Sequence, residues 1–176
     1  MSDSDDPAQV SNRAAQLREA FDRAFAEAPR AAEGAMVELL AIRIAAMRCA
    51  IRLSDIRGIF PDKRITPVPS RRDELIGVAS FRGAVIPVYG LQALLGVPGG
   101  TNPRWLVIAA AGNVALAFDE LESHLRVAPA SLESAGGGQR TTKHIESFLR
   151  IDGFVRGVIH VPSLMAAIGM QAAKRD

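Results

Sequence analysis

The order of apolar and polar residues changes its period along this chain, and the change separates the chain into parts. Between Ala8 and Ala28 the apolar residues recur at steps of three and four, which puts them on one face of an α-helix. Asp6 can cap this helix, Pro7 suits its first turn, and Pro29 ends it. The pattern predicts an amphipathic N-terminal helix with a charged opposite face. Its apolar stripe consists of Val10, Ala14, Leu17, Phe21, Phe25 and Ala28.

The helix is followed by a short segment, Ala28 to Gly34, with the composition of a linker. We therefore expect a helical extension and linker at residues 1–34 and a separate domain at residues 35–172. The apolar stripe can cover the body of the protein, or it can serve as a docking or self-association helix.

From Glu38 onward the period changes to two, as in half-buried strands. Apolar residues alternate with others over residues 40–45 and again over residues 47–53, which predicts two strands joined by a tight turn near Ala45. Cys49 points inward on this pattern and is interpreted as a small buried hydrophobe.

Two loops and a short helix are also expected. Ser54 and Asp55 can cap a helix that runs through Arg57 and ends at Gly58. The three prolines of residues 61–70 indicate an irregular crossing. Residues 128–143 lack periodicity and contain three adjacent glycines, which is typical of a mobile surface loop.

Further strands are separated by glycine-containing turns, and most form pairs. Gly83, in the Arg82-Gly83 turn, can adopt the positive φ that such a turn often requires. The turns at Gly112-Asn113 and Asp152-Gly153 are placed in the same way. The predicted strands are residues 75–81, 84–88, 104–110, 114–118, 121–127, 147–151 and 154–161.

One stretch of sequence occurs twice. Residues 85–96 and residues 158–169 share Val, Ile, Val, Leu, Ala and Gly at the same positions of the alignment, and Leu95 aligns with Ile168. This predicts that one unit, a strand followed by a short helix, is used twice. Ser163 is expected to cap the second of these helices.

Composition narrows the class of protein. A chain of 176 residues with 48% apolar residues can form one domain or two small subdomains, and its 5% of aromatic residues favours an aliphatic, β-rich core. The net charge is +2 and the basic residues are scattered, so we expect no nucleic-acid partner. One cysteine allows no internal disulfide. The uncharged stretch Trp105 to Phe118 is too short to span a bilayer, and no signal peptide is present, so we expect a soluble, cytoplasmic protein without membrane insertion.

The chain offers no catalytic or metal-binding constellation. Its three histidines show no ligand spacing, its serines lie in no G-x-S-x-G motif, and its glycine triplet has no phosphate-binding context. Asp119, Glu120 and Glu122 could divide acid and base roles, but neighbours in an extended segment point to opposite faces. They are better interpreted as an acidic edge that is solvated or faces a partner. We expect no enzyme activity, no cofactor and no metal.

Residues 76–88 read I-G-V-A-S-F-R-G-A-V-I-P-V. This segment resembles the CheW-like family of chemotaxis coupling proteins, whose usual pattern is G-V-I-N-L-R-G-x-V-I-P-V. Other parts of the chain follow in the order of the family, and together they cover residues 38–169. They are the strand pair of residues 40–53, the loop of residues 65–69, Phe118 to Leu121, and the closing strand and helix.

The resemblance implies a mainly β fold of two packed, SH3-like, five-stranded barrels with a groove between them, here preceded by the amphipathic helix. It implies a non-enzymatic adaptor that couples the cytoplasmic tips of methyl-accepting chemoreceptors to a CheA-type histidine kinase. By position, Arg82 and Gly83 occupy the turn that lies near partner contacts in this family, although Arg82 can also be a solvated turn residue. A planar guanidinium can satisfy several acceptors on a partner. The candidate partner-binding residues are Ile59, Phe81, Arg82, Gly83, Asp119 and Glu120.

Four positions depart from the family pattern. Gly58 replaces the usual glutamate after the first short helix, Gly90 replaces the aspartate after the I-P-V strand, and Ser163 stands at the matching place in the second copy. Ser80 replaces the asparagine two places before the arginine. The alternative to an ordinary adaptor is a diverged CheW-like interaction module that serves a different partner through its N-terminal helix.

Overall fold

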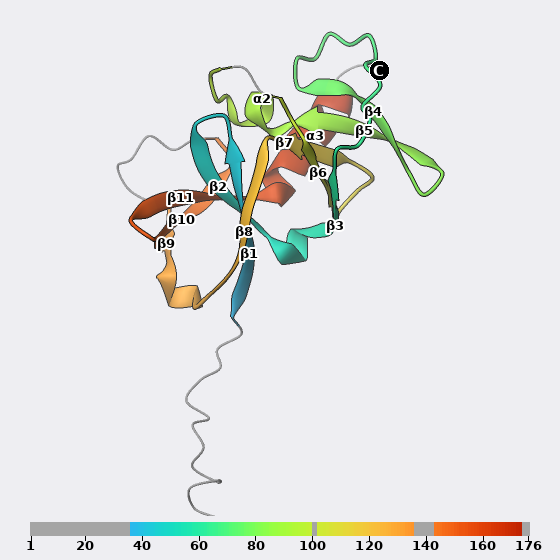
Figure 1. The fold of residues 1–176 in the computed structure, drawn as a ribbon. Coiled ribbons are helices and arrows are strands. Elements are labelled where there is room, and N and C mark those ends of the chain that lie inside the picture. Colours follow the sequence, from blue (N-terminus) through green and yellow to red (C-terminus); the bar gives the residue numbers. More distant parts are fainter. Residues whose placement is uncertain (1–35, 100–101, 136–142, 174–176) are drawn as a thin grey trace, which may run out of the picture. The chain divides into compact units, whose positions relative to one another are not determined.

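The part of the chain described by a computed structural model, residues 36–99, 102–135 and 143–173, is built mainly from β-strands (Figure 1). The predicted helix of residues 8–28 lies outside the described residues. The described residues contain two α-helices, α2 (Leu91–Leu95) and α3 (Val161–Ala173). The strands are β1 (Val37–Ile44), β2 (Met47–Arg52), β3 (Ile56–Pro61), β4 (Leu75–Phe81), β5 (Ala84–Gly90), β6 (Trp105–Ala109), β7 (Ala115–Phe118), β8 (Glu120–Val127), β9 (Leu132–Ser134), β10 (Ile145–Ile151) and β11 (Phe154–Ile159).

The strands form two sheets, and each sheet takes strands from both halves of the chain. The first has the order β8-β1-β2-β11-β10-β9 and the second has the order β3-β6-β7-β5-β4. Apart from the extra β9, the two orders are equivalent. The equivalent strands are β1 and β6, β2 and β7, β8 and β3, β10 and β4, and β11 and β5. The parallel pairs β2–β11 and β5–β7 occupy equivalent places. The mainly β fold that the family resemblance implies is confirmed, with two sheets where two five-stranded barrels were expected, and the first sheet has six strands.

The internal repeat is present, but its register differs from the one that the letters suggest. The Arg82-Gly83 turn of the β4–β5 hairpin corresponds to the Asp152-Gly153 turn of the β10–β11 hairpin, with φ angles of 48° and 83° in one and 51° and 75° in the other. From each turn onward, residues 82–91 and 152–161 have the same burial class at every position. The offset is therefore 70 residues, whereas the sequence alignment used 73. The valine and isoleucine residues of these strands can be aligned approximately at either offset. The positions of the two turns show that the offset of 70 is the structural one.

This register also corrects the prediction for Ser163. Helix α3 begins at Val161, two residues earlier, so Ser163 lies inside the first turn and does not precede it. The Ser163 hydroxyl donates to the carbonyl of His160. The structural counterpart of Gly90, which precedes α2, is therefore His160, which precedes α3.

The predicted strand pair of residues 40–53 is confirmed, but β1 is buried on both faces. Leu39 to Ile42 are all buried, because two cores meet across this strand. Leu40 and Ile42 join the largest apolar cluster, which includes residues of both sheets, α2 and α3, whereas Leu39 joins a smaller cluster within the first sheet. Cys49 is fully buried, as the alternation predicts.

Two local predictions were wrong. The helix expected through Arg57 is a 3-10 turn of only three residues, Leu53–Asp55, and Gly58 lies inside strand β3 at a change of register. Part of the loop expected at residues 128–143 is ordered, as a 3-10 turn at Pro129–Ser131 and the short strand β9. Strand β9 pairs with β10, and this long-range contact has no signal in the local composition.

Candidate partner-binding site

The predicted Arg-Gly turn lies at the end of the β4–β5 hairpin (Figure 1). Both turn residues have positive φ, 48° at Arg82 and 83° at Gly83, as in the two-residue turns that match the twist of a hairpin. Residues 80–85, which we call the hairpin end, are all exposed except Phe81. The end therefore presents the Arg82 guanidinium on a short, geometrically defined turn.

Phe81 was predicted to contact a partner, but it is buried beneath the hairpin end. Its ring meets that of Phe60 from β3 edge to face, with centroids 4.8 Å apart. The Lys63 ammonium lies 5.4 Å from the Phe81 centroid and 5.7 Å from that of Phe60. An edge-to-face pair of rings with a cation nearby stabilises the base of the hairpin. Phe81 thus positions Arg82 from below and does not form part of the exposed surface.

Val85 is a functional candidate that the sequence reasoning missed. It is 66% exposed and pairs with Ser80 across the hairpin. The signal was available in the alternation, because Ile86 and Val88 are buried and Val85 falls on the opposite face. An exposed valine beside an exposed arginine gives the hairpin end both an apolar and a charged contact.

Ile59 does not belong to this surface. It pairs with Val107 and is partly buried against the largest apolar cluster. The adjacent Phe60 packs with the Phe81 cluster on the other face of β3. The residue of β3 that supports the hairpin end is therefore Phe60.

Asp119 is a structural acceptor at the point where the chain passes from the second sheet to the first. Its Oδ2 accepts the backbone N–H of Ala45 at 2.6 Å, and its Oδ1 accepts that of Asn102 at 3.1 Å. Its own N–H donates to the carbonyl of Arg43. Because both carboxylate oxygens are occupied within the chain, Asp119 holds the turn between β1 and β2 in place. This does not support the predicted contact with a partner.

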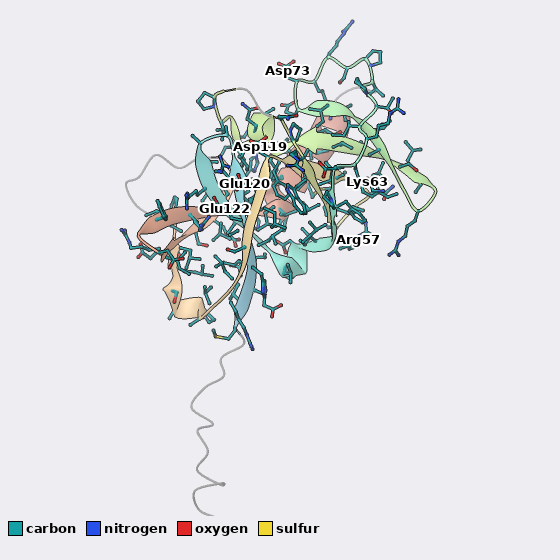
Figure 2. The ribbon with its side chains drawn as sticks, in the orientation of Figure 1. Arg57, Lys63, Asp73, Asp119, Glu120 and Glu122 are labelled. Atoms are coloured by element: carbon teal, nitrogen blue, oxygen red, sulfur yellow. The ribbon has the colours of Figure 1, made fainter. Side chains whose placement is uncertain are left out.

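Glu120 is exposed, as predicted, but it belongs to a network of charges in the first sheet. Figure 2 shows Asp119, Glu120 and Glu122 following one another from the start of β8. Glu120 pairs with Arg43 of β1. Glu122 pairs with Arg156 of β11 at 2.5 Å and lies 3.8 and 3.9 Å from the guanidinium nitrogens of Arg43 and Arg48. The six candidate residues are thus divided among the hairpin end, the cores and this network.

A cleft of about 240 Å³ is lined by residues of both sheets. Ile44 of β1 lines it together with Ala117 and Phe118 of β7. Asp73 and Asp119 contribute carboxylates to the lining. The lining thus combines apolar residues with two acidic ones between the two sheets.

The described residues contain no arrangement suited to catalysis. The pKa of Cys49 is raised to about 12 because burial disfavours its thiolate, so it is not a nucleophile. His144 Nδ1 lies 2.8 Å from the Ser163 hydroxyl, but that hydroxyl donates to His160, so His144 does not act as its base. No group of three metal-ligating side chains was found within residues 36–99, 102–135 and 143–173. In the same part of the chain no helix is long and apolar enough to cross a membrane.

Comparisons with known proteins agree with this architecture. A crystal structure of the scaffolding protein TtCheW from Thermoanaerobacter tengcongensis superimposes with a TM-score of 0.62 at 19% identity, covering 70% of this chain and 88% of that one. The chemotaxis protein CheW of Thermotoga maritima is 26% identical over 119 residues, which are 66% of this chain and 79% of the relative. The family model of the CheW-like domain matches residues 38–169, most of the chain. The chain therefore belongs to the CheW-like domain family of chemotaxis scaffolding adaptors, which are not enzymes.

Proposed function

We propose that this protein couples the cytoplasmic tips of methyl-accepting chemoreceptors to a CheA-type histidine kinase, and that the hairpin end contacts one of them. The observation that carries the proposal is the hairpin end itself, where Arg82 and Val85 are exposed above the contact between the buried Phe81 and the partly buried Phe60. The turn, with positive φ at both of its residues, presents a guanidinium and an apolar side chain close together, and both can contribute contacts to a partner.

The two sheets give a physical reason for a coupling role. Because residues of both sheets share the largest apolar cluster, we expect a displacement of one sheet to affect the other. The cleft between Ile44 and Phe118 offers a second surface, next to the Asp119 contacts that join the sheets. We assign the protein to the cytoplasm, with residues 1–34 as an extension outside the adaptor domain, which fits the family match from residue 38.

The departures from the family pattern bear on partner choice. Gly90 leaves α2 without a side-chain cap, and a β-carbon placed there would come no closer than 3.5 Å to Ile76. The missing aspartate is therefore not excluded by packing. At Gly58 a β-carbon would lie 3.0 Å from the Phe60 ring, so glycine suits the local packing of β3. These replacements favour a chemosensory system whose partners have changed along with the adaptor.

The test is the substitution Arg82→Glu in the full chain. Binding to the kinase and to a receptor signalling tip of the same organism is measured by calorimetry, with Arg71→Glu as a control that makes the same charge change in an exposed loop. We expect Arg82→Glu to weaken at least one interaction about tenfold, because it exchanges an attraction for a repulsion, while the melting temperature stays the same. Unchanged affinity for both partners would remove Arg82 from the site.

A deletion of residues 1–29 separates this function from that of an interaction module acting through its N-terminal segment. A coupling adaptor keeps its kinase affinity after the deletion. Loss of kinase binding in the truncated protein, with the melting of the domain preserved, would contradict the proposal and favour the other function.

A further inference from the structure

A second exposed surface lies on the first sheet, beside the β10–β11 hairpin. It is a groove of about 460 Å³ formed by β2, β10 and β11 and the turn before β2. Phe154 and Val155 in its wall are 46% and 47% exposed, two of the few large apolar side chains that the described surface presents. The other lining residues used below are Met47, Arg48 and Phe148. We call this surface the Arg48–Phe154 groove.

Arg48 has a fixed position in this groove. Its guanidinium carbon lies 3.9 Å from the centroid of the Phe154 ring, a close cation–π contact. The side chain is 36% exposed, so part of the cation remains available to an incoming group. Arginine and aromatic residues held in this way are typical of the side chains that dominate the energy of protein interfaces.

Arg48 is also the least neutralised member of its charge network. Three arginines, Arg43, Arg48 and Arg156, face two carboxylates, Glu120 and Glu122, which leaves one positive charge in excess. Glu120 forms an ion pair with Arg43. The Glu122 carboxylate lies 2.5 Å from the buried Arg156 guanidinium but 3.9 Å from that of Arg48. The excess charge therefore lies mainly on Arg48, the arginine that borders the groove.

We propose that the Arg48–Phe154 groove docks an amphipathic, acidic segment of a partner protein. An apolar side chain of that segment enters the hollow between Met47, Phe148 and Val155, and a neighbouring carboxylate pairs with Arg48. Charge complementarity selects this occupant. One partly neutralised cation beside an apolar hollow is a poor match for a nucleic-acid backbone, which requires several basic groups along a line.

The groove is distinct from the hairpin end in position and in chemistry. The β10–β11 hairpin is the internal counterpart of the β4–β5 hairpin, with the same burial pattern over residues 152–161 and 82–91. Its turn carries Asp152 where the first hairpin carries Arg82, and Phe154 replaces Ala84, whereas Val155 matches Val85. The two equivalent hairpins therefore offer different partners different surfaces.

The test uses a synthetic peptide and neither a kinase nor a receptor, so its failure is distinguishable from failure of the proposed function. The probe is a fluorescein-labelled helix of about 16 residues, long enough for partial helicity, with leucines on one face and glutamates beside them. A matched probe carries lysines in place of the glutamates. Binding to the full chain is followed by fluorescence polarisation up to about 1 mM, which covers weak docking.

We expect the acidic probe to bind about tenfold more tightly than the basic one, because one partly exposed charge pair replaces a repulsion. Arg48→Glu should reverse that preference, and Phe154→Ser should weaken both probes. Arg71→Glu, distant in sequence and exposed, should change neither. Each variant is checked by its melting temperature, and nuclear magnetic resonance shifts of Met47, Arg48 and Val155 on titration locate the site. Absence of binding, an equal affinity for both probes, or an unchanged preference in Arg48→Glu would overturn the proposal.

Discussion

Removal of the Asp119 carboxylate tests whether this residue supports the fold or contacts a partner. In Asp119→Ala the N–H groups of Ala45 and Asn102 lose their acceptor. The Ala45 contact is short and partly buried and its acceptor is charged, so its loss costs about 1.5–2.5 kcal/mol, and the exposed Asn102 contact adds about 0.5 kcal/mol. Ala45 also has a φ of 51°, an unfavourable conformation that this hydrogen bond helps to hold. We expect the free energy of unfolding to fall by about 2–3 kcal/mol.

The assay is urea unfolding of the full chain, followed by the fluorescence of Trp105, the only tryptophan in the sequence. A loss of this size lowers the urea midpoint by about 1–2 M. Asp119→Asn keeps one acceptor oxygen but turns an amide group toward the other N–H, so its midpoint should lie between those of the wild type and the alanine variant. Glu120→Ala is the control, because its exposed ion pair with Arg43 contributes at most about 1 kcal/mol.

Two results would refute this reasoning. If Asp119→Ala unfolds at the same urea concentration as Glu120→Ala, the two hydrogen bonds do not stabilise the turn between β1 and β2. If Asp119→Ala keeps its stability but binds a kinase or receptor more weakly, Asp119 is a partner-binding residue, as the sequence suggested. Affinity is therefore measured on the folded fraction of each variant.

Two further predictions concern backbone conformation and pH. Gly77→Ala should destabilise the protein by about 3 kcal/mol or more, because its β-carbon would lie 2.3 Å from the carbonyl oxygen of Thr66. Gly83→Ala has open space around it and should cost only about 1–2 kcal/mol, for its positive φ. Equal urea midpoints for the two variants would contradict this prediction. Burial, with the nearby charges of Lys143 and His160, lowers the pKa of His144 in the folded protein. As the pH falls, the His144 imidazole is therefore protonated in the unfolded chain before it is protonated in the folded one. Its contribution to stability is present above the ordinary pKa of about 6.5 and is lost as the pH falls through the lower folded value. His144→Asn, which tolerates the φ of 67° there, should reduce the pH dependence of the melting temperature below pH about 6.5, and an unchanged profile would exclude His144 as its source.

The strands and their turns could be predicted because their signals are local. Alternation of apolar residues locates β1 and β2, and glycine in the Arg82-Gly83 and Asp152-Gly153 turns locates two hairpins. The exchange of strands between sheets could not be predicted, since pairing β11 with β2 depends on contacts more than a hundred residues apart. The repeat was placed three residues out of register for a related reason: valine and isoleucine fit several strand alignments, and only the turn geometry separates them.

The candidate site was predicted less completely than the fold. Arg82 and Gly83 were named from the family motif and lie on an exposed turn, and their contact with a partner stays a prediction, whereas Phe81 of the same motif points into the core. Adjacent carboxylates look alike in a sequence, and the crossing between the sheets decides that Asp119 turns inward and Glu120 outward. The groove escaped notice because Arg48 and Phe154 lie on strands that are distant in sequence.

Under the proposed function, the internal symmetry gives one small chain two equivalent hairpins whose exposed residues can differ. If both halves had kept the same exposed residues, the two hairpins would bind the same partner twice. The burial pattern around the two turns is the same, so packing has kept the strand and helix unit in both places. Two exposed positions have diverged, with Arg82 against Asp152 at the turn and Ala84 against Phe154 beside it, whereas an exposed valine is kept at Val85 and Val155. A repeated core with unlike surfaces is the arrangement that a bridge between two different proteins requires, since each surface can change without disturbing the other or the fold beneath it.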